Sequence, residues 1–484
     1  MMRNLSLLHY MSRYLLLIVC FLLSFQPYTM GNCFKNSNIF GVLSDQVVNV
    51  SSFGAKGDGI TDDTESINKA IIYAKNKTLN FDDNKVYLIK SKLDFSKWSG
   101  RVLGKSWIKC DLNTKFSQVI DLSLSHDVIW NYLSVDMGQS LATEDNDLRS
   151  DNGFYMFNSR NITINDVQVK NVRIGEPIYI NGSSSKSAGK SDGSKYIYIN
   201  RFKCIAIPYN KVDRGVMFIV RSDFYTGTGY KGEIYGASNG VNRYKYKLDQ
   251  SFSLPQTTEH VYINDCYMEN FDRLALLNVR NVKGSNNRLI NFYTRGITLS
   301  PTCSNVEFRG GAVGANAAMI NVNLCCNNIT FDGIEALGSK TIVGQRHAIR
   351  TGQGCSNIMF KNIHGYGCET ALAVIEGVHN VTFDNVHLKS WKGNSLSTNA
   401  IIIGANNGVD SDVSFQVTNI RFINCSFQAR YGIFYRKYGL DSVDFSQIRF
   451  ENVKFKLGST KYNTDSKFGI IPKNINTKGI SYIK

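Results

Sequence analysis

The sequence predicts an all-β solenoid, a single coil of short parallel strands with one α-helix over its N-terminal end. Three observations lead to this prediction. Short apolar segments alternate with polar turns from residue 79 onwards, a motif of the form Asn-Ile/Val-Xaa-Phe/Ile recurs along the chain, and a glycine-rich stretch at 53–59 runs directly into a helical pattern. We therefore expect one repeat fold for the 484 residues, rather than two or three ordinary domains.

The glycine-rich stretch and the helix after it occupy residues 53–71. Asp62 is expected to cap the helix by accepting a backbone N–H, while Glu65 reaches back. Four apolar residues then fall on one helical face that must be buried, namely Ile67, Ala70, Ile71 and Ala74. A phosphate-binding loop is disfavoured, because the stretch lacks Gly-Lys-Ser/Thr and its three acidic residues would repel a phosphate.

This stretch resembles the N-terminal signature of the pectate-lyase-like superfamily of right-handed parallel β-helix proteins. The superfamily includes pectate lyases, polygalacturonases and phage tailspike depolymerases. The resemblance implies a single-stranded right-handed parallel β-helix whose N-terminal α-helix caps the open end of the coil. It implies little about chemistry, because the signature belongs to the cap and not to the active site.

The internal repeat supports the coil independently. From Asn305 to Gln447, successive repeats are 23, 29, 23, 39 and 28 residues apart, which is typical of a solenoid whose turns carry loops of different length. Equivalent residues would lie about 4.8 Å apart, so each repeat Asn should hydrogen-bond through its amide to the Asn above and below. The repeats begin at Asn161, Asn305, Asn328, Asn357, Asn380, Asn419 and, as variants, His260 and Gln447.

Cysteines follow the same register. Three lie two residues before a repeat Asn and two occupy an apolar position after it, so we expect them to pack in the core as small apolar side chains. A metal site would need thiolates that converge on one point. Isolated disulfides stay open as an alternative. These residues are Cys303, Cys326, Cys355, Cys266 and Cys425.

The chain divides into four expected segments. Residues 1–31 read as a secretory signal peptide, because Arg3 and Arg13 precede or flank an apolar run of about 12 residues. A lead-in and cap follow at 32–78, the parallel β-helix at 79–457 and a C-terminal tail at 458–484. We expect a secreted or periplasmic protein that contacts a membrane only if the signal stays uncleaved.

The net charge of +16 favours an acidic partner, and in an exported protein this suggests an acidic polysaccharide. Nucleic acid is disfavoured, since there is no zinc-finger spacing, no RNA-binding aromatic motif and no concentrated Lys/Arg helix.

Aligning the repeats on the Asn reveals a candidate site. The position eight residues before it should point into the coil and holds Ile297, Ile320, Ile349 and Leu372. The next position should point outward and holds Thr298, Asn321, Arg350 and Ala373. Near this outward column lie Arg346, His347, Arg295, Asp272 and Arg273.

These residue types suit β-elimination of a uronate glycoside. The reaction needs a neutralised carboxylate, removal of the C5 proton and protonation of the leaving oxygen. We therefore predict Arg350, His347 and Arg346 as catalytic residues, and Arg295, Asn321, Asp272 and Arg273 as substrate-binding residues. The alternative stays open that these arginines only bind an acidic chain or hold a loop.

Two long insertions at 182–194 and 224–246 interrupt the strands. The second is rich in Tyr, with Lys and Arg among them, which suits stacking on sugar rings and contact with carboxylates. Tyr225 and Tyr230 are accordingly predicted to bind substrate; a rigid hairpin held by aromatic pairs is the alternative.

Carboxylates give weaker signals. The polygalacturonase branch carries Asn-Thr-Asp, Asp-Asp and Gly-His-Gly on consecutive central turns; here Asn-Thr-Asp stands at 463–465, Asp-Asp at 62–63 and 82–83, and Gly-His-Gly is absent. Hydrolysis by that subtype is therefore disfavoured. We expect no cofactor, except that an acidic segment could hold Ca²⁺, as in some lyases of this fold, or be a solvated loop. It comprises Glu144, Asp145, Asp147 and Asp151.

The leading expectation is an exported carbohydrate-active protein that binds and cleaves an acidic polysaccharide, as a lyase rather than a hydrolase. One alternative is a non-catalytic periplasmic factor in exopolysaccharide production or export. The other is a phage tailspike-type depolymerase.

Overall fold

The computed structural model describes sixteen stretches of the chain that all belong to one compact unit, Ser44–Lys484. The expected signal peptide, 1–31, lies outside them. Within these stretches no helix combines the length and the hydrophobicity needed to cross a membrane. The described residues are 46–114, 116–139, 151–182, 193–208, 216–222, 257–338, 347–352, 354–367, 371–390, 399–404, 406–407, 414–415, 417–436, 447–459, 469–470 and 479–483.

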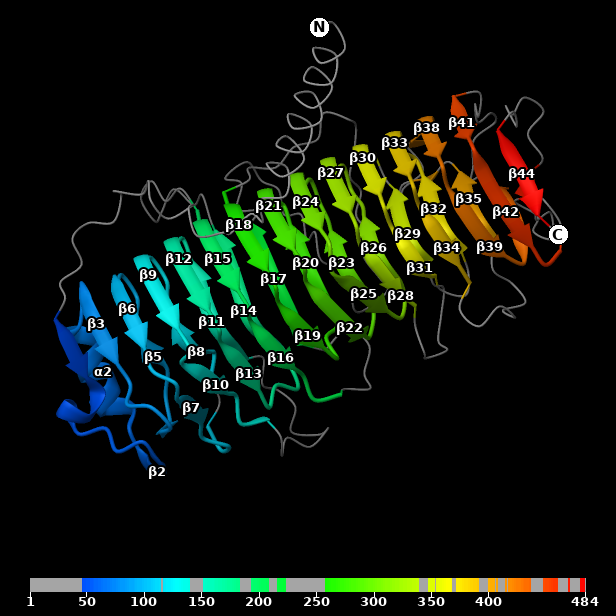
Figure 1. Ribbon diagram of the computed structural model, residues 1–484. Helices are drawn as coiled ribbons and strands as arrows, with labels where there is room; N and C mark the ends of the chain where they lie inside the picture. Colours follow the sequence, from blue (N-terminus) through cyan, green and yellow to red (C-terminus); the bar gives the residue numbers. More distant parts are fainter. Residues whose placement is uncertain are drawn as a thin grey trace, which may run out of the picture. The chain divides into compact units, whose positions relative to one another are not determined.

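Three long sheets, called A, B and C, build this unit, and each complete turn of the coil, or rung, adds one strand to each of them in the same order (Figure 1). Neighbouring strands within each sheet are parallel, apart from one terminal pair in the third sheet. Sheet A has fourteen strands in the described residues: β1 (Val47–Asn49), β3 (Lys77–Asn80), β6 (Gly100–Leu103), β9 (His126–Asn131), β12 (Arg160–Asn165), β15 (Lys195–Asn200), β18 (Glu259–Asn264), β21 (Arg280–Ser285), β24 (Ser304–Arg309), β27 (Asn327–Asp332), β30 (Ser356–Lys361), β33 (His379–Asp384), β38 (Thr418–Ile423) and β41 (Ile448–Glu451).

Sheet B follows sheet A in every rung. Its strands, again within the described part, are β2 (Asp58–Asp62), β4 (Val86–Ile89), β7 (Trp107–Cys110), β10 (Ser134–Asp136), β13 (Gln168–Lys170), β16 (Lys203–Ile205), β19 (Tyr267–Glu269), β22 (Arg288–Phe292), β25 (Ala312–Ala315), β28 (Glu335–Leu337), β31 (His364–Tyr366), β34 (His387–Lys389), β39 (Ser426–Ala429), β42 (Val453–Leu457) and β44 (Ile480–Ile483).

Sheet C completes the rung. Its strands are β5 (Leu93–Asp94), β8 (Gln118–Asp121), β11 (Asp151–Phe157), β14 (Gly175–Gly182), β17 (Val216–Ser222), β20 (Arg273–Leu277), β23 (Arg295–Leu299), β26 (Ala318–Val322), β29 (His347–Gly352), β32 (Ala371–Glu376), β35 (Asn399–Gly404), β40 (Tyr431–Arg436) and the antiparallel β43 (Gly469–Ile470). A short hairpin, β36 (Asn406–Asn407) with β37 (Ser414–Phe415), lies beyond β35.

The predicted parallel β-helix is therefore confirmed, and its sheets extend past the expected limits of 79–457. β1 and β2 precede residue 79, while β44 follows residue 457 and pairs in parallel with β42. Parts of the expected lead-in, 32–78, and of the expected tail, 458–484, thus belong to the coil.

One continuous apolar core fills the coil from Val48 to Phe455. The Phe of the repeat motif forms a column in it, in which neighbouring rings stack with centroids 4.8–5.8 Å apart. Aromatic stacking adds to the burial of each ring. The column contains Phe308, Phe331, Phe360, Phe383, Phe422 and Phe450.

The cysteines predicted to be in the core are buried. Cys303, Cys326 and Cys355 are each 0% exposed, and Cys266 and Cys425 are each 1% exposed. All five thiols are free, which removes the disulfide alternative for them. Burial raises the pKa of the Cys266 thiol to about 12 and that of Cys425 to about 11, so these thiols are inert packing groups.

The predicted asparagine ladder is present. The Nδ2 of Asn328 donates to Asn305 Oδ1 at 2.7 Å, and the Nδ2 of Asn419 donates to Asn380 Oδ1 at 2.6 Å. The repeat asparagines also adopt a left-handed backbone, with φ of 55° at Asn380, which the sequence pattern did not reveal. Asn is favoured here for two reasons, since it bonds along the coil and tolerates this conformation better than most residues.

Replacing Asn380 with Ala should therefore lower the thermal midpoint, because two ladder bonds are lost and Ala is strained at positive φ. We expect a loss of about 1–3 kcal/mol. Asn380→Gly, which loses the same bonds but accepts the backbone conformation, should be the milder of the two variants. Equal midpoints for the two would contradict the role assigned to the backbone.

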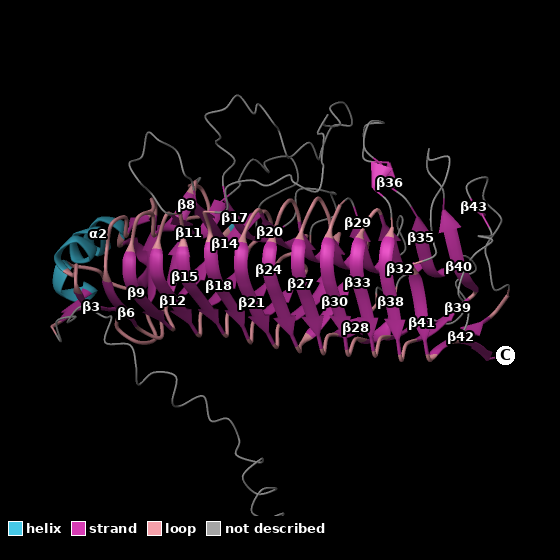
Figure 2. Ribbon diagram, turned by 90° about the horizontal axis from the view of Figure 1, so that it is seen from above, coloured by secondary structure: helices cyan, strands magenta, loops and turns pink. Residues whose placement is uncertain are grey.

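The N-terminal end is closed by α2 (Thr64–Tyr73), preceded by a 3₁₀ turn, η2 (Val50–Phe53) (Figure 2). The four apolar residues predicted to face the core are buried: Ile67, Ala70, Ile71 and Ala74. The indole of Trp98 donates to the carbonyl oxygen of Ile71 at 3.0 Å and ties the helix to the first rungs.

The cap differs from the prediction in detail. The N-cap residue is Asp63, and its side chain makes no capping hydrogen bond. Its carboxylate instead accepts the backbone N–H groups of Lys56 at 2.6 Å and Gly57 at 3.0 Å and so holds the glycine turn. Asp62 still accepts a backbone N–H, from Thr64 at 3.1 Å. Glu65 does not reach back, because it pairs with Lys69 at 2.6 Å.

Candidate functional site

The longest connections that leave the coil adjoin the strands of sheet C. Thirty-six residues separate β17 from β18, fourteen separate β10 from β11 and twelve separate β14 from β15. The other two sheets carry short turns on most rungs. Because loops held on a rigid scaffold usually carry the functional residues, sheet C is the candidate location of the site.

One column of outward side chains runs along sheet C, and the polarity of its residues changes twice along the coil. It is apolar at Ile219 and Ala275, polar at the next three strands, and apolar again from Val374 onwards. The polar stretch consists of Thr298, Asn321 and Arg350, in direct register on β23, β26 and β29. The sequence alignment therefore predicted these three neighbours correctly.

The alignment failed one rung later. Val374, not Ala373, lies beside Arg350, and Ala373 lies beside Ile349. Two residues connect β32 to β33, whereas three connect β29 to β30, so a count back from the repeat Asn slips by one position. Val374 joins Ala371, Ile402 and Phe434 in an apolar cluster separate from the main core.

Several polar atoms in the polar stretch are buried without a hydrogen-bond partner among the described residues. They are Thr298 Oγ1, Asn321 Nδ2 and Asn323 Oδ1. The Nδ2 of Asn323 donates to Asn321 Oδ1 at 3.0 Å, which leaves one donor and one acceptor of the amide pair side by side. Unsatisfied buried groups are costly, and when clustered they indicate a place where a ligand binds.

Charged groups flank this stretch. The Nη2 atom of Arg350 lies 3.5 Å from Glu376 Oε2, and the Glu376 side chain is only 4% exposed. Three rungs earlier, Arg273 Nε lies 2.6 Å from Asp272 Oδ2, and Thr294 Oγ1 also donates to Asp272 at 2.6 Å. Arginines thus occur on several strands of one sheet, a distribution that suits a chain of carboxylates.

The structure brings together only some of the predicted site residues. Asn321 and Arg350 are direct neighbours, while Arg295 and His347 share a second column, two strands apart, on either side of Ala318. This second column lies three residues, or about 10 Å, along the strands from the first. His347 is 9% exposed at the start of β29. Arg346, Tyr225, Tyr230 and the acidic segment lie outside the described residues, apart from the backbone of Asp151.

Sheet C also holds a carboxyl group that the sequence did not single out. Glu176 on β14 is buried, and this burial raises its pKa to about 7, while the charge of Arg221 on the neighbouring strand opposes the rise. A carboxyl group near neutrality can act as a proton donor or acceptor at physiological pH. No residue pattern marks it, since the shift comes from burial alone.

The raised pKa of Glu176 gives a pH prediction. The folded pKa of about 7 exceeds the unfolded value of 4.5, so the protonated form is stabilising and its contribution is complete below pH 4.5 and lost as the pH rises through 7. The loss should be about 3 kcal/mol. Thermal midpoints between pH 5 and pH 8 should fall in the wild type and fall less in Glu176→Gln; identical slopes would contradict this reading.

Known proteins resemble the chain in its N-terminal sequence and in its fold. The family model "Rhamnogalacturonase A/epimerase, pectate lyase-like" matches residues 47–89, which run from β1 to β4 and include the cap. The A-module of mannuronan C-5 epimerase AlgE6 from Azotobacter vinelandii matches 90% of this chain and 99% of its own, with 13% identity and a TM-score of 0.54. The match to a pectate-lyase-like family model is thus confined to this N-terminal stretch, while the similarity along the whole chain is one of fold. The right-handed parallel β-helix is as the sequence resemblance implied.

Other similarities are more local or concern the fold alone. PfbA, a surface adhesin of Streptococcus pneumoniae, matches 88% of this chain and 95% of its own at 16% identity and a TM-score of 0.54. A capsule K30/K69-specific depolymerase of Klebsiella phage K64-1 is 47% identical over 53 residues, 10% of this chain and 7% of its own. A non-secreted LysM effector, LysM19, of Penicillium expansum is 35% identical over 83 residues, 16% of this chain. The matched stretches span 6–7% of these curated relatives.

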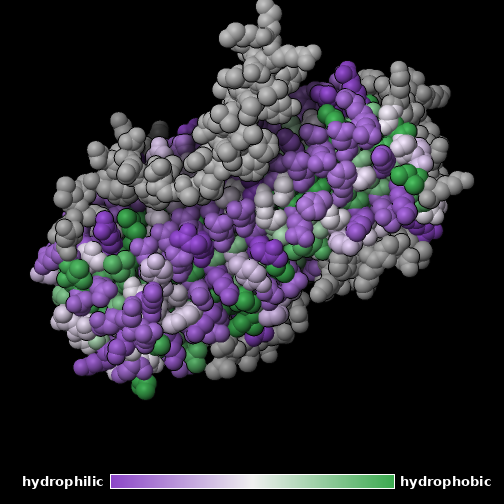
Figure 3. Space-filling view, viewed as in Figure 1, coloured by the Kyte–Doolittle hydropathy of each residue, from purple (hydrophilic) through white to green (hydrophobic). Residues whose placement is uncertain are grey.

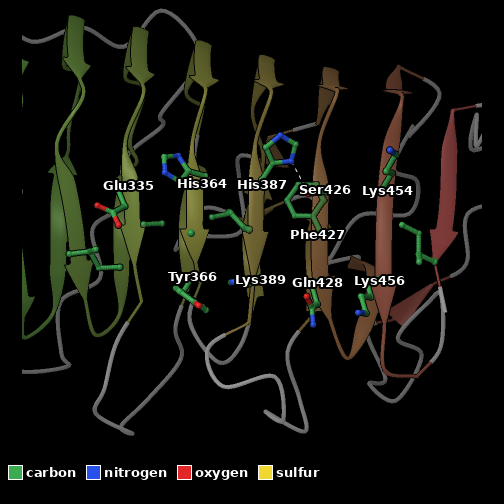
Figure 4. Close-up of a pocket in the computed structure, with 15 residues that line it drawn as sticks. Glu335, His364, Tyr366, His387, Lys389, Ser426, Phe427, Gln428, Lys454 and Lys456 are labelled. Atoms are coloured by element: carbon green, nitrogen blue, oxygen red, sulfur yellow. Dashed lines mark hydrogen bonds between the residues drawn. The ribbon is translucent and has the colours of Figure 1, made fainter.

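A second candidate surface of this β-helix protein lies on sheet B. A groove of about 740 Å³ runs over the outer side chains of β28, β31, β34, β39 and β42 (Figure 4). Lys389, Lys454 and Lys456 line it together with His364 and His387. In the described part of the face seen in Figure 3, hydrophilic residues dominate and apolar ones are scattered.

Sequence reasoning missed this groove, although a signal for it exists. The residues seven positions after successive repeat asparagines are Glu335, His364, His387 and Ser426, and they lie side by side in sheet B. Counting forward from the repeat Asn, as well as backward, would have found them. Among the described residues no group of three or more His, Cys, Asp or Glu side chains is placed to hold a metal ion.

Proposed function

We propose that the protein binds an acidic polysaccharide along the outer face of sheet C and cleaves it, by β-elimination rather than by hydrolysis. The observation that carries the proposal is the polar stretch between two apolar patches of the same column, in which Thr298 and Asn321 are buried and Arg350 is half-buried. Sugar hydroxyls and a uronate carboxylate are the groups that its unsatisfied donor and acceptor and its guanidinium would bind.

The roles follow from the chemistry of the residues. The Arg350 guanidinium has five N–H donors, so it can hold a substrate carboxylate while it pairs with Glu376. Neutralising that carboxylate makes the C5 proton acidic. His347 is the candidate for proton transfer, since an imidazole exchanges protons near neutrality. Glu176 lies five strands from Arg350 in sheet C, about 24 Å along the coil, and is too distant to act on the same sugar residue.

The comparisons support the substrate class. A capsule depolymerase and a mannuronan epimerase are among the proteins that this chain resembles, and mannuronan is a polyuronate. The likeness to a surface adhesin supports the second candidate, a non-catalytic protein that binds the glycan. The ion pairs of Arg350 and Arg273 also fit that role, because they hold these arginines in place without further chemistry. Either function would be exercised outside the cytoplasm.

One set of assays decides between the candidates. The full chain is incubated with a panel of polyuronates and acidic capsular glycans, and ultraviolet absorbance, reducing ends and binding are measured. Elimination predicts new absorbance from unsaturated uronates together with new reducing ends. Reducing ends without absorbance would overturn elimination in favour of hydrolysis, and binding without either signal would establish the non-catalytic role. Failure to bind any acidic glycan would overturn the proposal.

A further inference from the structure

A chain of hydrogen bonds crosses four rungs and ends at a serine in the sheet B groove. The Nδ2 of Asn362 donates to Asp332 Oδ1 at 2.8 Å, and the Nδ2 of Asn385 donates to Asn362 Oδ1 at 2.8 Å. The Nε2 of His387 lies 2.8 Å from Asn385 Oδ1, and its Nδ1 lies 2.7 Å from Ser426 Oγ. Figure 4 shows the imidazole of His387 turned toward Ser426.

The carboxylate of Asp332 determines which group donates and which accepts in every hydrogen bond of this series. An ionised Asp332 can only accept, so the amide of Asn362 must present its NH₂ group to Asp332 and its oxygen to Asn385. Asn385 is then oriented in the same way and offers its own oxygen to His387. His387 therefore carries its proton on Nε2, and the lone pair of Nδ1 faces the hydroxyl group of Ser426.

This is the arrangement of an activated nucleophile. A hydroxyl group donates to a base, and the base is held in the correct tautomer by a third group on its far side. His387 is exposed and Ser426 is half-buried, so a ligand in the groove can reach both. Lys454 lies directly opposite Ser426 on the next strand, about 4.8 Å along the coil, where its ammonium group can stabilise an oxyanion.

We propose that Ser426 and His387 form an acyl-transfer site that hydrolyses esters of small acyl groups. Ser426 Oγ attacks the ester carbonyl carbon as its proton passes to His387 Nδ1. The tetrahedral intermediate collapses, the C–O bond to the alcohol breaks and His387 returns the proton to the leaving alkoxide. Water, deprotonated by His387, then attacks the acyl-Ser426 ester, and collapse releases the carboxylic acid and restores the serine. No oxidant or further co-reactant is needed.

The groove also indicates which molecule carries the ester. Lys389, Lys454 and Lys456 favour an anionic carrier, and the ammonium group of Lys389 lies 4.3 Å from the centre of the Tyr366 ring. Aromatic faces next to cations suit acidic sugars. The substrate class is thus an acidic glycan that bears small O-acyl groups. This identity of the carrier rests on the proposed function, whereas the ester cleavage rests on the groove alone.

The test uses the full chain with a fluorophosphonate probe and with p-nitrophenyl acetate. The probe should attach to Ser426, as located by mass spectrometry of the peptides, and wild-type protein should hydrolyse the acetate ester. Ser426→Ala and His387→Ala should each lower this hydrolysis by about 100-fold or more. Ser481→Ala is the matched control, because Ser481 lies in the same outward column beyond Lys454 and should leave the rate unchanged.

Absence of label on Ser426 in the wild-type chain would overturn the proposal, and this measurement does not depend on the folding of any variant. A folded Ser426→Ala that hydrolyses the ester at the wild-type rate would overturn it too. The products keep the two proposals separate, because ester cleavage releases a carboxylic acid from an intact glycan, whereas elimination shortens the glycan and leaves an unsaturated uronate.

Discussion

Ile67→Asp is expected to yield aggregates in place of a soluble folded protein. Ile67 is 0% exposed on the inner face of α2, so the substitution places a carboxylate in the apolar core with no partner. Burying this carboxylate should cost about 3–5 kcal/mol or more, so the helix should detach from the end of the coil. A displaced cap exposes the core and the strand edges of the first rung, and such edges pair with other molecules. Size-exclusion chromatography of the purified protein would measure the effect.

Ile72→Asp provides the control on the same helix. Ile72 is 78% exposed, so this variant introduces the same side chain with the same helix propensity but leaves the core untouched. It should elute as the wild type does. A soluble, folded Ile67→Asp protein that lacks only activity would show that the helix belongs to the functional site and does not serve as the cap.

Arg350→Ala is expected to lower cleavage of the glycan by at least about 100-fold, because the substrate carboxylate loses the cation that neutralises it. Rates of product formation at several substrate concentrations would give kcat/KM for the wild type and the variant. Arg350→Lys should recover only part of the loss, since an ammonium group cannot bind a carboxylate through two parallel N–H bonds.

Two further variants separate the loss of the substrate-binding cation from a loss of stability and from a change in net charge. Arg350→Ala leaves the buried Glu376 without this ion pair, so Arg350→Ala combined with Glu376→Gln removes the cost of an uncompensated charge. Arg309→Ala is the control for net charge, because the Arg309 side chain is 68% exposed on sheet A and pairs with Glu307. Full activity in Arg350→Ala would remove Arg350 from the site.

The sequence was most informative where one residue type has one structural task in every rung. The repeat Asn and Phe positions predicted the amide ladder and the core, and the alternation of Ile297 with Thr298 and Ile320 with Asn321 predicted which side chains face outward. These predictions depend only on strand periodicity and on neighbours one rung away. The helical cap was also found at the right place, although its N-cap residue is Asp63 instead of Asp62 and Glu65 does not reach back.

Predictions failed where geometry between rungs decides. A turn shorter by one residue moved Val374 into the place expected for Ala373, and no sequence feature signals that change. The raised pKa of Glu176 comes from its burial in the folded coil. The contact between His387 and Ser426 joins residues 39 positions apart, and it becomes visible only when the rungs are in register.

The parallel pairing of the rungs also determines how the coil would respond to force. Its interstrand hydrogen bonds run along the coil axis, so tension applied between the two ends of the coil loads the bonds of one rung at a time instead of shearing many together. Since each rung contacts mainly its neighbours, the coil should unravel in steps, and a rung of 23 residues would release about 80 Å of chain. A protein anchored at one end while holding a long glycan would thus yield gradually under a pull, and the rungs that had not yet opened would keep their side chains in place.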